Sequence, residues 1–227
     1  IPSARTVNDK TFKIIVFSAI VLAVFGLYWP SLQNGFVFDD EQIVINNSQV
    51  TSLKNIGKAF TSCIWEPHLE TCYERSNYYR PLHTLSIMLA LSLSKGFINS
   101  TNPFLFHLFN IIYYIIFSWL VFILLNRLFQ NRLASILGTA IFVFHPLHAE
   151  SVMWISGLPE LLMGIFIIWA FLVHDSDRLA RRRWLAGFLF FLALLSKETA
   201  IALIPVIIIY DYFSNRINNY NSDPVGR

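Results

Sequence analysis

The chain has 227 residues, of which 55% are hydrophobic, 16% aromatic and only 14% charged. A soluble domain of this length could not bury so much apolar surface, so the composition excludes an ordinary soluble protein and predicts an integral membrane protein. The net charge of +3 is small and the basic residues are dispersed in short loops, which favours a lipid bilayer as partner and no nucleic acid.

The first membrane-length apolar run covers residues 12–29, which at about 1.5 Å per residue can cross a hydrocarbon core of about 30 Å. Further apolar segments follow at residues 104–125, 133–144, 152–173 and 184–213. The last segment contains Lys197 and Glu198 and is either one long helix or two half-length helices that meet at Ser196. We therefore expect an all-α bundle of five or six transmembrane or half-length helices.

A polar stretch from about residue 30 to residue 103 separates the first two spans and predicts a large first loop. It holds both cysteines, Cys63 and Cys72, which either close a short disulfide in an oxidising compartment or remain unrelated thiols. Residues 82–93 are apolar but too few to span, so we expect them at the membrane interface, with Arg80 held at headgroup level.

The distribution of arginines predicts the orientation. The cluster at residues 178–183 is the strongest signal for a cytoplasmic segment, and alternation of spans places Arg127 and Arg132 on the same side. The predicted organisation is a cytoplasmic N-terminus (1–13), a multi-pass transmembrane module (14–213) and a polar C-terminal tail (214–227). The first loop is then exoplasmic, in a periplasm or a lumen.

Two pairs of charged residues are candidates for chemistry. Asp39 and Asp40 directly follow the first span, where a carboxylate can activate an acceptor at the membrane surface. Lys197 and Glu198 would lie at membrane depth, where a charge is costly unless it is paired or opens to water. They are therefore functional groups or, alternatively, an ion pair at an interfacial turn.

Two groups of polar residues allow more than one interpretation. His107 and Asn110 share a helical face at the start of the second span, where they could line a polar cavity or form packing contacts between helices. His145, His148 and Glu150 lie at a break between apolar segments, but their spacing is not that of a closed metal site. Contact with a phosphate is favoured over protein-only metal binding; a divalent cation, Mg²⁺ or Mn²⁺, shared with that phosphate at His148 and Glu150 is the alternative.

These residues belong to motifs that occur in a characteristic order. The motifs are at residues 38–40 with 45–47, 79–82, 106–110, 144–157 and 195–200. With them the chain resembles the N-terminal membrane module of the GT-C glycosyltransferases, nearest the transmembrane and tetratricopeptide-repeat O-mannosyltransferases and their bacterial relatives. The resemblance covers nearly everything from the first span to residue 212, and it implies a GT-C-like bundle.

The resemblance also implies an activity, the transfer of a sugar from a polyprenyl-phosphate donor to a hydroxyl of a protein or glycan outside the cytoplasm. A carboxylate, Asp39 or Asp40, would take the proton of the attacking hydroxyl. The departing phosphate would need fixed cations and hydrogen-bond donors, which we expect to be Arg80, His145, His148 and Lys197. We expect supporting roles for His107, Asn110, Glu150 and Glu198.

One departure from the family pattern leads to an alternative hypothesis. After Ser156 and Gly157 the family commonly has a basic and then an acidic residue, whereas here Leu158 replaces the base and only the acid, Glu160, remains. The chain also has fewer apolar segments than the family's membrane core. The alternative is a catalytically inactive, truncated GT-C-like structural subunit that packs with other membrane subunits in a larger complex.

Overall fold

The computed structural model describes residues 8–64, 78–98, 101–176 and 180–213, and within these ranges the chain is helical, without a strand. Three helical stretches are long and apolar enough to cross a membrane: Asp9–Gln33, Phe104–Phe129 and Ile155–Asp175. Two shorter apolar helices accompany them. The expectation of an all-α membrane protein is confirmed.

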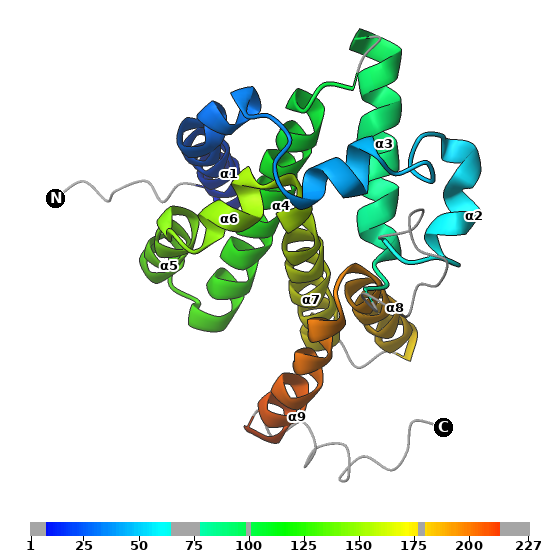
Figure 1. Cartoon of the computed structure of the whole chain (residues 1–227). Coiled ribbons are helices and arrows are strands. Elements are labelled where there is room, and N and C mark those ends of the chain that lie inside the picture. The colour runs from blue at the N-terminus through cyan, green and yellow to red at the C-terminus, as the bar shows by residue number, and fades with distance from the viewer. Residues whose placement is uncertain (1–7, 65–77, 99–100, 177–179, 214–227) are drawn as a thin grey trace, which may run out of the picture.

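The α-helices and the short turns of 3₁₀- or π-helix (η) have the following bounds in chain order: α1 (Asp9–Tyr28), η1 (Trp29–Gln33), η2 (Glu41–Ile45), η3 (Leu53–Asn55), α2 (Ile56–Ala59), α3 (Pro81–Ile98), α4 (Phe104–Phe129), α5 (Arg132–Phe144), α6 (His148–Met153), η4 (Ile155–Gly157), α7 (Leu158–Ser176), α8 (Ala180–Ser196), η5 (Glu198–Ala202) and α9 (Leu203–Phe213). Helix α4 lies near the centre and contacts α1, α3, α5 and α7 (Figure 1). Helix α7 in turn packs against α8, which together with α9 forms the other side of the bundle.

The second and third apolar segments are joined by a tight turn. Gln130, with a φ of 51°, ends α4 in the left-handed conformation, and the side chain of Asn131 accepts a hydrogen bond from the backbone nitrogen of Ala134 to start α5. This turn returns the chain along α4, so α1, α4 and α5 bury a common core that includes Ile111 and Phe122. A Tyr28–Tyr114 edge-to-face contact closes that core at the C-terminal end of α1.

The long first loop is a folded layer. Its apolar residues Ile43, Val44 and Val50 are buried against α3 and α4, where they meet Met88 and Phe106. Helix α3 extends beyond the apolar run that predicted it and buries one face in this cluster. Cys63 forms a disulfide, while Cys72 lies outside the described residues.

The last apolar segment forms two helices, as one of the two alternatives predicted. Helix α8 ends at Ser196, Lys197 is extended (φ −157°, ψ 137°), and η5 leads into α9. The break brings charged side chains back to the end of the bundle where α7 begins, because Lys197 pairs with Glu160 in the first turn of α7.

Charged residues therefore gather at both ends of the bundle. At one end, Arg132 pairs with Asp9 (3.5 Å) and lies over the ring of Phe12, which joins α5 to α1. Beside it, Arg127 near the end of α4 pairs with Asp175 of α7. The opposite end holds the first loop, the α5–α6 connection and the break at residue 197, and it contains the cavity.

Candidate functional site

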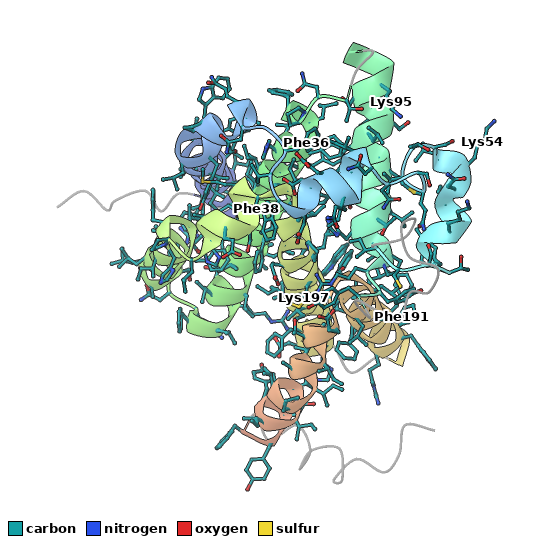
Figure 2. All side chains as sticks on the ribbon, viewed as in Figure 1. Phe36, Phe38, Lys54, Lys95, Phe191 and Lys197 are labelled. Carbon is teal, nitrogen blue, oxygen red and sulfur yellow. The ribbon has the colours of Figure 1, made fainter. Side chains whose placement is uncertain are left out.

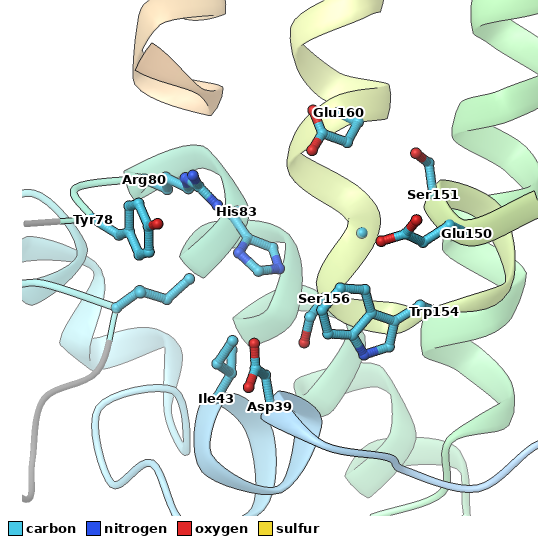
Figure 3. A pocket seen from close by; sticks show the side chains of 12 residues that line it. Asp39, Ile43, Tyr78, Arg80, His83, Glu150, Ser151, Trp154, Ser156 and Glu160 are labelled. Atoms are coloured by element: carbon cyan, nitrogen blue, oxygen red, sulfur yellow. The ribbon is translucent and has the colours of Figure 1, made fainter. Parts of the chain in front are cut away.

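A cavity of about 350 Å³ lies between the first loop, the start of α3 and the start of α7. It is lined by Asp39, Ile43, Ile64, Tyr78, Arg80, His83, Glu150, Ser151, Trp154, Ser156, Gly157 and Glu160. Figure 3 shows Arg80 and His83 on one wall, Glu150 and Glu160 on the other, and Asp39 at the base. Segments up to 121 residues apart in sequence, from Asp39 to Glu160, thus meet in one polar opening.

A strained turn presents Asp39 to the cavity. Phe38 has a φ of 50°, a conformation that costs a residue with a side chain about 1–2 kcal/mol, and its ring is 87% exposed. The turn is closed by a bond from the backbone nitrogen of Asp40 to the carbonyl of Val37 (3.0 Å). Asp39 is half-buried and makes no hydrogen bond or ion pair with a described residue, so its carboxylate is available to a ligand.

Asp40 has a different position from its neighbour. It is fully buried, and its carboxylate accepts hydrogen bonds from the backbone nitrogen of Val37 (3.1 Å) and from the backbone nitrogen (3.0 Å) and hydroxyl of Ser156. Burial raises the pKa of Asp40, although these hydrogen bonds act in the opposite direction. Asp40 therefore fastens the first loop to η4, while Asp39 alone lines the cavity.

Arg80 is held from two sides. Its guanidinium lies 4.5 Å from the ring centre of Tyr78, and it donates two hydrogen bonds to Glu198, from Nη2 (2.9 Å) and Nε (3.3 Å). Burial opposes ionisation of Glu198, but the hydrogen bonds and charge of Arg80 prevail and lower the pKa of Glu198. The same two-pronged geometry would suit a phosphate.

Lys197 does not line the cavity. Its ammonium group contacts the carboxylate of Glu160, which does line it. The adjacent residues Lys197 and Glu198 thus form ion pairs on the two walls, Lys197 with Glu160 of α7 and Glu198 with Arg80, which directly precedes α3. Lys197 and Glu198 do not pair with each other: each forms an ion pair with a residue that lines the cavity.

The wall opposite Arg80 is built by the α6–η4 turn. Asn110 donates a hydrogen bond to the carbonyl of Trp154 (2.8 Å), which fixes this turn to α4. Gly157 packs directly on the preceding helix: a Cβ at this position would lie 2.8 Å from Cα of Ser151 and 3.0 Å from the carbonyl of Glu150. The close approach keeps Glu150 and Ser156 at the same opening.

The remaining predicted histidines lie outside the cavity lining. His107 is 1% exposed, and its ring approaches the carbonyls of Asn34 and Gly35 without reaching hydrogen-bond geometry. The ring of His148 lies against that of Phe142 at a tilt of 45°, with ring centres 4.3 Å apart, and burial together with the nearby His145 lowers the pKa of His148. His145 is exposed. Neither His107 nor Asn110 lines the cavity; both contact neighbouring segments, which is what the packing alternative predicts.

No group of three or more His, Cys, Asp or Glu side chains is placed to hold a metal ion among the residues that the structure describes. Among the polar cavity residues that the sequence analysis did not predict, which include Tyr78 and Ser151, the most deeply buried is His83. It follows Arg80, the residue directly before α3, by three positions, and this is the spacing that places side chains on one side of a helical turn. That spacing was the available signal.

Comparison with known proteins agrees with the resemblance that the sequence motifs indicate. The chain is 31% identical over 212 residues to protein O-mannosyl-transferase TMTC3 of Mus musculus, which covers 90% of this chain and 22% of the mouse protein. Similar matches are TMTC3 of Homo sapiens (31%, covering 86% and 21%) and Tmtc1 of Drosophila melanogaster (30%, covering 88% and 23%). No family model and no solved structure matches.

The chain thus spans about a fifth of the length of the curated relatives it matches. They carry the family name that the motifs predicted, and the resemblance is confirmed. Over about nine tenths of its own length, this chain is a sequence relative of the TMTC protein O-mannosyl-transferases.

Proposed function

We propose that the chain forms the membrane-embedded catalytic site of a glycosyltransferase that moves mannose from a polyprenyl-phosphate donor to a hydroxyl of a protein. The names of its relatives supply the sugar and the acceptor class. The observation that carries the proposal is the cavity itself, where the carboxylate of Asp39 and the guanidinium of Arg80 face one opening at the end of membrane-length helices.

The two groups suit the two ends of such a transfer. As the acceptor hydroxyl attacks the anomeric carbon, its proton passes to Asp39, which is half-buried and free to accept it. The bond from the anomeric carbon to the phosphate oxygen breaks, and the charge of the departing phosphate is stabilised by Arg80. The polyprenyl tail can stay in the bilayer during this exchange.

An exoplasmic cavity agrees with two further observations. Cys63, in the loop beside the cavity, is disulfide-bonded, and disulfides persist mainly in oxidising compartments. Arg127 and Arg132 lie at the opposite end of the bundle, where positively charged residues mark the cytoplasmic side. Both support the proposed orientation.

The proposal is tested with Asp39→Asn, assayed in membranes with mannosyl-phosphoryl polyprenol and a peptide acceptor. We expect transfer to fall about 100- to 10,000-fold, because the amide cannot take the proton, while the melting temperature in detergent stays unchanged. Glu41→Gln is the matched control: Glu41 is exposed, lies two residues away and does not line the cavity. Equal transfer by wild type and Asp39→Asn would reject the proposal.

A structural subunit is the second candidate, and one observation favours it. Both cations near the cavity, Arg80 and Lys197, already pair with carboxylates of the same chain. If these pairs serve only to hold helices together, Arg80→Ala would destabilise the bundle and the wild-type protein would show no transfer to any hydroxyl acceptor.

A further inference from the structure

His83 has an unusual environment for a histidine. It projects from α3 into the cavity wall, is 1% exposed, and neither ring nitrogen has a hydrogen-bond partner among the described residues. In Figure 3 its ring lies between the guanidinium of Arg80 and the carboxylate of Asp39. Buried polar groups in folded proteins are nearly always paired, so this ring requires an explanation.

The protonation state of His83 limits what it can bind. Burial, assisted by the positive charge of Arg80, lowers the pKa of His83 to about 3. The imidazole is therefore neutral at physiological pH and offers one N–H donor and one nitrogen acceptor. A hydroxyl group can bond either ring nitrogen, by accepting from the N–H or by donating to the other nitrogen, whereas an ionised phosphate can only accept from the N–H.

The position of the ring indicates that this hydroxyl belongs to the transferred sugar and not to the acceptor. In the proposed reaction the phosphate lies at Arg80 and the attacking hydroxyl at Asp39, so the sugar must occupy the space between them. His83 lines that space. The other fully buried histidine among the described residues, His107, does not line the cavity and faces the backbone of the first loop instead.

We propose that His83 is a sugar-binding residue, which hydrogen-bonds a hydroxyl of the transferred sugar and thereby helps to select the donor. This inference rests on the proposed function. It assigns His83 no role in proton transfer and leaves Asp39 as the base.

The test uses His83→Leu and His83→Gln in the full chain. Leucine removes both hydrogen-bonding groups, so kcat/KM with mannosyl-phosphoryl polyprenol should fall about tenfold to a hundredfold. Because an unpaired imidazole also leaves the core, the melting temperature without donor should rise by about 2–4 °C. Glutamine keeps a donor and an acceptor and should recover most of the activity. Met88→Leu, at an equally buried position of α3 outside the cavity lining, is the matched control and should keep full transfer.

A donor series identifies the contact. With one sugar hydroxyl at a time replaced by hydrogen, one donor should lose about tenfold with wild type and nothing further with His83→Leu. Lower stability of His83→Leu together with wild-type transfer would overturn the inference, since the residue would then be structural.

Donor-induced thermal stabilisation separates the two proposals. If donor stabilises wild type but not His83→Leu and no transfer occurs, the proposed function fails and the sugar-binding role stands. If donor stabilises both proteins equally, or neither, the sugar-binding role is overturned.

Discussion

The two ends of the bundle carry similar residues in opposite arrangements. At the end away from the cavity, the guanidinium of Arg127 pairs with the carboxylate of Asp175 and donates a hydrogen bond to the backbone carbonyl of the same residue (2.6 Å). Tyr210 donates to the Asp175 carboxylate (2.6 Å), and His174 pairs with Asp211 (2.9 Å). These contacts join α4, α7 and α9. At the cavity end, two carboxylates, Asp39 and Glu150, have no hydrogen bond or ion pair with a described residue.

The difference separates structural charges from available ones. A charge that is buried with a partner mainly keeps helices in register, and removing that partner is destabilising. A carboxylate that lines a cavity without a partner contributes little to the fold and keeps its capacity to bind or to accept a proton. Figure 2 shows side chains filling the bundle. Lys197 is labelled near the centre of this view, at the break where the chain turns back toward the cavity.

Arginine-to-lysine exchange at each end gives the largest expected contrast. Arg80→Lys keeps the charge but loses the two-pronged contact, so transfer should fall about a hundredfold with little change in melting temperature. Arg127→Lys should leave kcat/KM within about threefold and lower stability by about 1.5–3 kcal/mol, because it loses bonds to Asp175. Transfer assays and thermal unfolding of both variants check this. Loss of stability in Arg80→Lys together with loss of transfer in Arg127→Lys would contradict the comparison.

Glycine-to-alanine exchange gives a smaller effect. At Gly157 the new methyl group would push on the backbone of Ser151 and Glu150, so we expect a loss of about 1–3 kcal/mol and reduced transfer as the cavity wall shifts. At Gly187 of α8 the methyl would point into open space, and stability should rise by up to about 1 kcal/mol. Unfolding curves that show the same change for both would contradict the packing described at the α6–η4 turn.

The smallest expected effect is a pH dependence at the cavity end. Above about pH 6.5 His83 is neutral in the folded and unfolded chain, so it adds no slope. As the pH falls below that value, the unfolded chain binds a proton that the folded chain refuses until about pH 3, and stability decreases. Between about pH 7.5 and pH 5.5 wild type should lose about 1.4 kcal/mol more than His83→Leu. Parallel pH profiles of the two proteins would show that the ring is accessible to protons.

Much of the fold could be predicted because it depends on local properties. Apolar runs of sufficient length predicted the spans at α1, α4 and α7. The path after residue 184 remained open, since a continuous apolar run does not reveal whether its helix continues. At the break, Lys197 contacts Glu160, 37 residues away, and such a long-range contact is not visible in the local sequence.

The candidate site was predictable in its members but not in their arrangement. Asp39, Arg80 and Glu150 line the cavity as a group, whereas Asp40, adjacent to Asp39 in sequence, is turned into the protein. The left-handed Phe38 and the hydrogen bonds to Ser156 decide between the two aspartates, and neither is visible in the dipeptide. His83 was missed because an isolated histidine in an apolar run looks like a core residue.

The sequence by itself determined the membrane class, the spans and the family resemblance, since these depend on composition, length and residue order along the chain. Only the tertiary structure decided which charges form ion pairs and which line the cavity, and that Arg80 and Glu160 do both. Pairing depends on distances between segments far apart in sequence, 37 residues for Lys197 with Glu160 and 118 for Arg80 with Glu198, and no local pattern encodes such distances.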